Sequence, residues 1–133
     1  SSQTVVRALL AGLEDEDFTV RSSAAEALGK LGNSSETVVS ALVSRRSDED
    51  SEVRSSAAEA LGKLGNSSQT VVRALLAGLE DEDLIARISA ASALGKLGKT
   101  SPDVVAAIVR WIEQHRDSEY LDDGINALWD AVV

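Results

Sequence analysis

The chain has 133 residues, 44% hydrophobic but only 3% aromatic, with a net charge of −9 and no cysteine. This composition suits one domain with a core of Ala, Val and Leu, and it excludes disulfides and thiolate metal sites. The acidic charge argues against nucleic acid, which needs clustered Lys and Arg, and the apolar runs are too short to span a membrane.

The sequence repeats with a period of 33 residues. The stretch VRSSAAEALGKLGN occurs identically at 20–33 and 53–66, and a divergent copy, ARISAASALGKLGK, occupies 86–99. The units are 1–33, 34–66, 67–99 and a divergent 100–133. Such a period is typical of stacked helical or mixed units that bury their apolar faces against one another. We therefore predict one repeat domain, residues 1–133, that ends in a capping unit, 100–133.

Each unit predicts a first helix that begins after a serine. Pro102 suits the first position of a helix, so the serine before it is an N-cap. The aligned N-caps are Ser2, Ser35, Ser68 and Ser101. In unit 1 the buried stripe of this helix is Val6, Leu9, Leu10 and Leu13.

A second helix follows each acidic loop. Its expected N-caps are Asp17, Asp50 and Asp83, and its expected buried stripe in unit 1 is Val20, Ala24, Leu28 and Leu31. Gly32, Gly65 and Gly98 stand where a left-handed glycine ends a helix. Gly29, Gly62 and Gly95 lie inside the helix, which predicts close approach of a neighbouring helix.

One charged residue conflicts with the pattern. Arg46 aligns with Leu13 and Leu79 on the buried stripe of the first helix. An unpaired buried charge is costly. We therefore expect Arg46 to reach solvent, to pair with an acid, or to follow a helix that ends a turn early.

The pattern D-x-D-x-x-V-R-x-x-A-A-x-A-L-G-K-L-G at 15–32 and 48–65 resembles the short HEAT-like repeats of the bilin lyase type, which also occur in bacterial scaffold proteins. The resemblance covers about three quarters of the chain. It implies an all-α fold, a right-handed α-solenoid of HEAT-like helical hairpins. It also implies that Arg21, Arg54 and Arg87 form a ladder with loop aspartates of adjacent units, such as Asp15, Asp48 or Asp81. Unit 4 has Tyr120 or Leu121 in place of this arginine.

The acidic loops and serines do not predict an enzyme. Counted from Asp15, carboxylates occupy some EF-hand positions, but Val20 stands where the calcium loop requires glycine. The His-Glu pairs that hold iron in deoxyhypusine hydroxylases, which this fold resembles, are missing, since His115 is the only histidine. The serines recur in every unit, as helix caps and small surface residues do. We expect no catalytic, cofactor or metal site.

The outward side of the second helices, on the concave side of such solenoids, remains for binding. The candidate protein-binding residues are Ser22, Glu26, Lys30, Ser55, Glu59, Lys63, Ile88, Ser92 and Lys96. Unit 3 has Ile88 for a serine and Ser92 for a glutamate, so this part of the face is slightly more apolar. An ordinary solvated face is the alternative interpretation.

We therefore expect a non-enzymatic scaffold or adaptor, a cytoplasmic fragment of a larger bacterial multidomain protein. It would bind another protein or peptide, neither nucleic acid nor a membrane, and would be monomeric in isolation. One alternative is a bilin lyase-type subunit that acts on a tetrapyrrole-carrying partner. Another is a designed or consensus-derived repeat protein without a natural ligand, although the divergent unit 4 and Arg46 favour natural drift.

Overall fold

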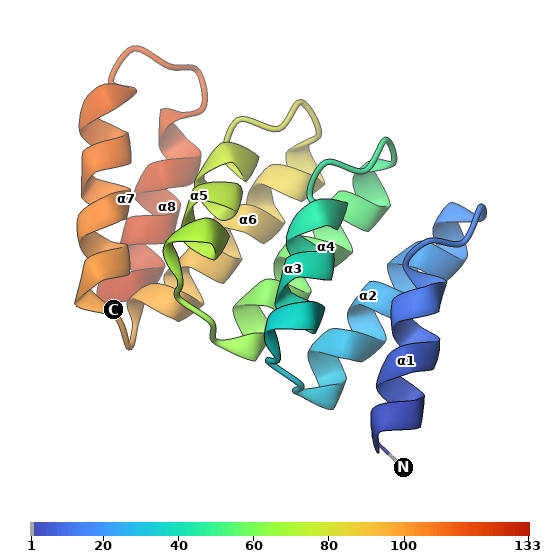
Figure 1. Cartoon of the computed structure of the whole chain (residues 1–133). Helices are drawn as coiled ribbons and strands as arrows, with labels where there is room; N and C mark the ends of the chain where they lie inside the picture. The colour runs from blue at the N-terminus through green and yellow to red at the C-terminus, as the bar shows by residue number, and fades with distance from the viewer. Residues whose placement is uncertain (1) are drawn as a thin grey trace.

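The computed structural model describes residues 2–133, with side chains from residue 3 onward, and within these residues all regular structure is α-helical. The helices form stacked pairs (Figure 1), with the two termini at opposite ends of the stack. The pairs are α1 (Ser2–Gly12) with α2 (Phe18–Leu31), α3 (Glu36–Arg45) with α4 (Ser51–Leu64), α5 (Gln69–Gly78) with α6 (Leu84–Gly98), and α7 (Pro102–Gln114) with α8 (Leu121–Val132). The fold is an α-solenoid, as expected.

The second helices begin at the aspartates that the sequence indicates. Asp17 Oδ1 accepts a hydrogen bond from the Thr19 amide at 2.8 Å, and Asp50 Oδ1 accepts one from the Glu52 amide at 2.9 Å. Asp83 caps α6 in the same way, through the Ala86 amide at 3.0 Å. These bonds satisfy backbone donors that a helix leaves free at its first turn. The acidic loops are therefore used first of all to start helices.

The other helix ends match the prediction with two qualifications. Ser35, Ser68 and Ser101 cap α3, α5 and α7, whereas the side chain of Ser2 lies outside the described residues. Gly32 and Gly65 end α2 and α4 in the left-handed conformation, at φ 77° and 71°. The prediction for Gly98 is wrong: it is the last residue of α6, where it packs against Ala131.

Glycine and alanine let the second helices approach one another closely. A Cβ on Gly29 would lie 2.8 Å from Ala60 Cα, and one on Gly62 would lie 2.9 Å from Ala93 Cα. α2, α4, α6 and α8 consequently pack along their lengths, whereas successive first helices meet at few positions. Because the more closely spaced row lies on the inside of a curved stack, we call the exposed surface of α2, α4, α6 and α8 the inner face.

The expected stripe of α2 is only half correct. Ala24 and Leu28 are 5% and 0% exposed, but Val20 and Leu31 are 40% and 42% exposed. In α4 the aligned Val53 is fully buried. The difference arises because Val53 is covered by the preceding unit, and no such unit stands before α2 among the described residues. A helical stripe in a stacked repeat is therefore buried only where a neighbour completes it.

Unit 4 packs in its own way. Trp111 is buried, its ring stacks on His115 at a centroid distance of 4.2 Å, and a Cβ on Gly124 would clash with it. The Arg87 guanidinium lies over the Tyr120 ring, 4.7 Å from its centroid. These aromatic contacts replace the Ala and Gly packing of the earlier units.

Arg46 is buried, and α3 does not end early to release it. The helix ends at Arg45, the position that aligns with the end of α5 at Gly78. Arg46 Nη1 lies 3.9 Å from Asp81 Oδ2, so pairing with an acid is the alternative that the structure adopts. Its Nε and Nη1 make no hydrogen bond within the described structure. Burial lowers the pKa of Arg46, and Asp81 offsets only part of this.

Candidate protein-binding surface

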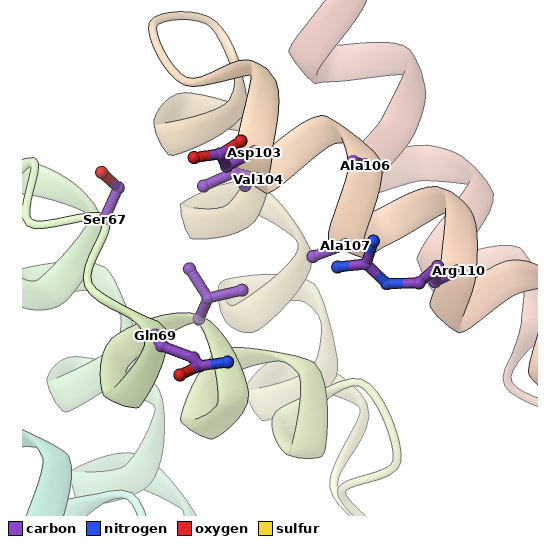
Figure 2. A pocket seen from close by; sticks show the side chains of 8 residues that line it. Ser67, Gln69, Asp103, Val104, Ala106, Ala107 and Arg110 are labelled. Atoms are coloured by element: carbon purple, nitrogen blue, oxygen red, sulfur yellow. The ribbon is translucent and has the colours of Figure 1, made fainter.

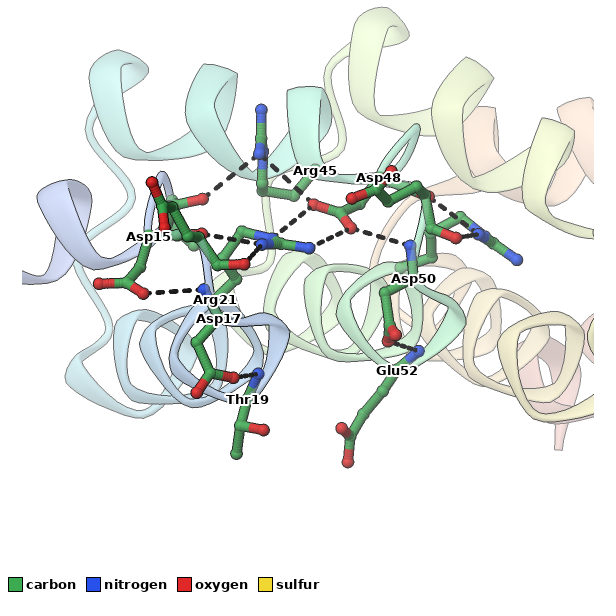
Figure 3. Close-up of polar contacts among 12 residues, drawn as sticks. Asp15, Asp17, Thr19, Arg21, Arg45, Asp48, Asp50 and Glu52 are labelled. Carbon is green, nitrogen blue, oxygen red and sulfur yellow. Dashed lines mark hydrogen bonds and ion pairs between the residues drawn. The ribbon is translucent and has the colours of Figure 1, made fainter.

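The ladder implied by the resemblance is present, and it joins each unit to the next (Figure 3). Arg21 donates from Nε to Asp48 Oδ2 at 3.0 Å and from Nη2 to Asp48 Oδ1 at 3.1 Å. Arg54 makes the same two bonds to Asp81, at 2.8 and 3.0 Å. Each Nη1 also donates to the loop of its own unit, to Asp15 O and Asp48 O at 2.8 Å. These paired, two-pronged bonds fix the spacing between loops.

The aspartates of the first two rungs are held ionised. Burial raises the pKa of Asp48, but the Arg21 hydrogen bonds and the Asp50 amide outweigh it, so the pKa lies below its ordinary value. Asp81 behaves alike, with Arg54 in the role of Arg21.

The third rung is built differently. Arg87 pairs with Asp123, near the start of α8, at 3.3 Å. Burial raises the pKa of Asp123 above its ordinary value, and Arg87 does not offset this. The ladder arginines are accordingly structural, and their contacts lie within the protein.

Two of the candidate binding residues are not available to a partner. Ser22 and Ser55 are 8% and 7% exposed, so the prediction that they point outward is wrong. Ser22 Oγ lies 2.7 Å from Ser56 Oγ, and Ser55 Oγ lies 2.6 Å from Ser89 Oγ. The serines form a hydrogen-bonded seam between successive second helices. The pair of adjacent serines in each copy was the available signal for this seam.

The charged candidates do lie on the inner face, over α2 and α4. Glu26 and Lys30 form an ion pair of 2.9 Å with side chains that are 53% and 65% exposed. Glu59 and Lys63 are exposed at the aligned positions. An exposed pair of this kind contributes little to stability. We call Glu26, Lys30, Glu59 and Lys63 the polar half of the inner face.

Large apolar side chains occupy the inner face over α6 and α8. Ile88, a predicted candidate, is 50% exposed, and Ile85 beside it is 59% exposed. On α8, Ile125 is 46% exposed and Trp129 is 64% exposed. We call these four residues the apolar half. Sequence reasoning assigned Trp129 to the packing of the cap, but three periods of 33 residues place Ile125 and Trp129 at the positions of Glu26 and Lys30.

This exposure is not a consequence of α8 being the last helix of the stack. Glu26 and Lys30 hold the same positions on α2, where α4 packs as the following helix, and both remain more than half exposed. These positions therefore face solvent in any unit. Trp129 and Ile125 are apolar at sites that stacking never covers.

A hollow adjoins the apolar half. It has a volume of about 250 Å³ and is lined by Ser92, Lys96, Lys99, Trp129, Asp130 and Val133. It brings the two remaining candidates of unit 3, Ser92 and Lys96, beside the exposed tryptophan. Lys96 has no counterpart of Glu26 four residues earlier, because Ser92 stands there. The hollow thus combines an aromatic side wall with ammonium groups.

Larger hollows on the outer side follow from the repeat geometry. One of about 330 Å³ lies between α5 and α7, with Gln69, Asp103 and Arg110 among its lining residues (Figure 2). Another, of about 440 Å³, lies between the aligned helices α1 and α3 and is lined by Val6 and Arg7 among others. Because the first helices are widely spaced, such hollows recur without a shared set of chemical groups.

Two further searches covered the described residues. They hold no cluster of three or more His, Asp or Glu side chains placed to bind a metal ion. None of their helices is long and apolar enough to cross a membrane.

Known structures share this architecture. An engineered protein superposes with a TM-score of 0.70 at 21% identity, over 95% of this chain and 62% of its own. The CpcE–CpcF complex of phycocyanin lyase from Nostoc sp. PCC7120 gives a TM-score of 0.68 at 27% identity, over 92% of this chain and 53% of that one. Human deoxyhypusine hydroxylase gives 0.70 at 19% identity, over 96% and 42%. The chain thus spans between 42% and 62% of the length of these proteins.

The sequence comparisons agree with the fold. No curated protein sequence matches the chain. The family model for HEAT repeats matches residues 1–62 and 39–129, which together include nearly every residue. The chain therefore belongs to the HEAT repeat family.

Proposed function

We propose that the protein is a non-enzymatic scaffold that binds a partner protein through the apolar half of its inner face. HEAT repeats suggest a protein-interaction scaffold. The observation that carries the finer proposal is Trp129, 64% exposed at a position where units 1 and 2 carry lysine. Exposed aromatic side chains grouped with apolar neighbours are typical of binding surfaces.

The chemistry of the surface favours one kind of partner segment. Ile85, Ile88 and Ile125 would receive branched or aromatic side chains next to Trp129. Lys96 and Lys99 line the adjoining hollow and would receive a carboxylate, although Asp130 lies there too. The net charge of −9 opposes nucleic acid as the ligand. We infer that the partner presents a peptide segment with apolar residues beside an Asp, a Glu or a terminal carboxylate.

Peptide display against the purified chain tests this proposal. Selected peptides should combine apolar residues with an acid and should change the emission of the exposed Trp129. The double variant Ile125→Glu/Trp129→Lys gives α8 the residues that α2 carries, so it should fold and bind selected peptides at least tenfold more weakly. Lys30→Ala on the polar half is the matched control and should bind as the original chain does. Equal binding by both variants would refute the proposal.

A second candidate function rests on the likeness to the phycocyanin lyase complex, at 27% identity over 92% of this chain. In that case the inner face would receive a partner that carries a tetrapyrrole. Titration with free bilin decides: a specific absorbance change, or transfer of the chromophore to an acceptor protein, favours this candidate over the scaffold alone. A bacterial origin, a cytoplasmic location and a monomeric state remain predictions.

A further inference from the structure

The first unit presents a face that its identical copy buries. Val20 is 40% exposed and Leu31 is 42% exposed, whereas Val53, which aligns with Val20, is 0% exposed. The sequences of 20–33 and 53–66 are the same, so the difference comes from the neighbours alone. We call Asp15, Val20, Ser23, Ala27 and Leu31 the N-terminal face.

In units 2 and 3, three groups of the preceding unit cover this face. Gly29 receives Ala60, Ser22 pairs with the hydroxyl of Ser56, and Arg21 binds the carboxylate of Asp48. The same three contacts recur one unit later, where Gly62 receives Ala93, Ser55 pairs with Ser89, and Arg54 binds Asp81. A following unit is therefore recognised through an arginine, the serine after it, and a glycine seven positions beyond that serine.

The N-terminal face carries the complementary groups without these partners. Asp15 aligns with Asp48 and Asp81, is exposed, and is bound by no arginine side chain within the described residues. Ser23 is exposed, while the aligned Ser56 is hydrogen-bonded across the seam. Ala27 is partly exposed, while the aligned Ala60 is 1% exposed against Gly29. A carboxylate, a hydroxyl and an apolar surface are thus arranged as in the two occupied junctions.

We propose that the N-terminal face is a docking site for a HEAT-like helical hairpin of a partner, whose second helix carries Arg-Ser followed by glycine at the seventh position. The guanidinium binds Asp15, the serine bonds to Ser23, and the glycine receives Ala27. Val20 and Leu31 become buried in the same step. This site is separate from the apolar half of the inner face and does not depend on its function.

A second copy of this chain does not fit as the occupant. Its free end is α8, where Tyr120, Leu121 and Leu128 stand at the positions of the arginine, the serine and the glycine. A leucine in place of the glycine would collide with Ala27, and tyrosine offers no charge to Asp15. Two N-terminal faces placed together would bring carboxylates to carboxylates. The occupant is therefore a unit with the pattern of units 1 and 2, not of unit 4.

The test joins one more unit to the intact chain, a copy of residues 1–33 placed directly before Ser1. Hydrogen exchange of the α2 amides should slow at least tenfold relative to the original chain. Replacing the glycine of the added unit that corresponds to Gly29 with leucine should abolish this protection while leaving the rest of the chain folded. If α2 exchanges as fast with the added unit as without it, the proposal is wrong.

A double-mutant cycle tests the recognition itself. Asp15→Asn should have little effect on the original chain but should destabilise the extended chain, and the loss should vanish when the arginine of the added unit is alanine. Equal effects of Asp15→Asn in both chains would contradict the proposed pairing. Sedimentation of the original chain covers the remaining occupant: a dimer abolished by Val20→Asp would assign the face to a second copy and overturn the proposal.

Discussion

The helices α2 and α4 share fourteen identical residues, 20–33 and 53–66, yet the two copies occupy different environments. Val53 is fully buried and Val20 is 40% exposed, and Asp48, at the start of unit 2's acidic loop, is bound by an arginine whereas Asp15 is not. The backbone of both is the same helix with the same aspartate cap and the same glycine end. In a stacked repeat, the energetic role of a residue is thus set by its neighbours as much as by its own unit.

The largest expected difference concerns the seam of small residues. Ala60→Leu should lower the free energy of unfolding by about 3 kcal/mol, because the larger side chain meets the Gly29 backbone and cannot be accommodated by rotation. Ala27→Leu, the same change in the identical segment, should stay within about 0.5 kcal/mol. Urea denaturation of the two variants measures both values. Equal losses would show that the two copies are not distinguished by their neighbours.

The next difference concerns the ladder. Asp48→Asn should cost about 2 kcal/mol, less than the loss of a fully buried ion pair, because it leaves the Arg21 guanidinium without its counter-charge. Asp15→Asn keeps the short bond to the Asp17 amide and should change stability by no more than about 0.5 kcal/mol. Thermal unfolding of both proteins at low and high salt provides the comparison. A loss at Asp15 as large as that at Asp48 would contradict it.

A smaller contrast is expected at the shared valine. Val53→Ala removes two buried methyl groups and should cost about 1.5 kcal/mol. Val20→Ala should be near neutral, since its side chain is already partly hydrated. Stability curves from chemical denaturation give both numbers under one condition. Placing the added unit before Ser1 should make the two substitutions equally costly, which links this contrast to the N-terminal face.

The smallest expected change makes unit 2 resemble units 1 and 3. Arg46→Leu replaces a buried guanidinium, 3.9 Å from its acid, with the residue found at the aligned positions 13 and 79. It should raise the free energy of unfolding by about 1 kcal/mol, because the desolvation of the charge exceeds its attraction to Asp81. Arg45→Leu, on the more exposed neighbour, is the control and should give no gain. A lower melting temperature for Arg46→Leu would show that the pairing with Asp81 outweighs burial.

Much of the fold could be predicted because its signals are local. The period of 33 residues, the aspartate caps and the internal glycines each act within one helix or one junction, and the structure confirms them. The outward direction of Ser22 and the inward direction of Val20 were wrong for a common reason. A single stripe of helical periodicity describes one contact surface, whereas a second helix in the middle of this stack has a neighbour on each side as well as its own first helix.

The candidate surface could be predicted only in part. Glu26, Lys30 and Ile88 were placed on the inner face by counting along a helix. Trp129 was missed because aromatic residues in a divergent last unit are usually core, as Trp111 is here. Only alignment of unit 4 with unit 1 by whole periods shows that Trp129 replaces an exposed lysine. Arg46 could be recognised as a conflict, but its outcome depends on Asp81, thirty-five residues away.

The seam of glycine and alanine also gives the solenoid a mechanical asymmetry. Along α2, α4 and α6 the backbones are already in contact, so this row cannot shorten. The outer row retains hollows of about 440 and 330 Å³ between α1 and α3 and between α5 and α7. A change of curvature must therefore open or close the outer hollows while the inner row acts as an inextensible hinge line. A partner held on the inner face would then feel rotation of the units about that line rather than stretching of the surface it binds.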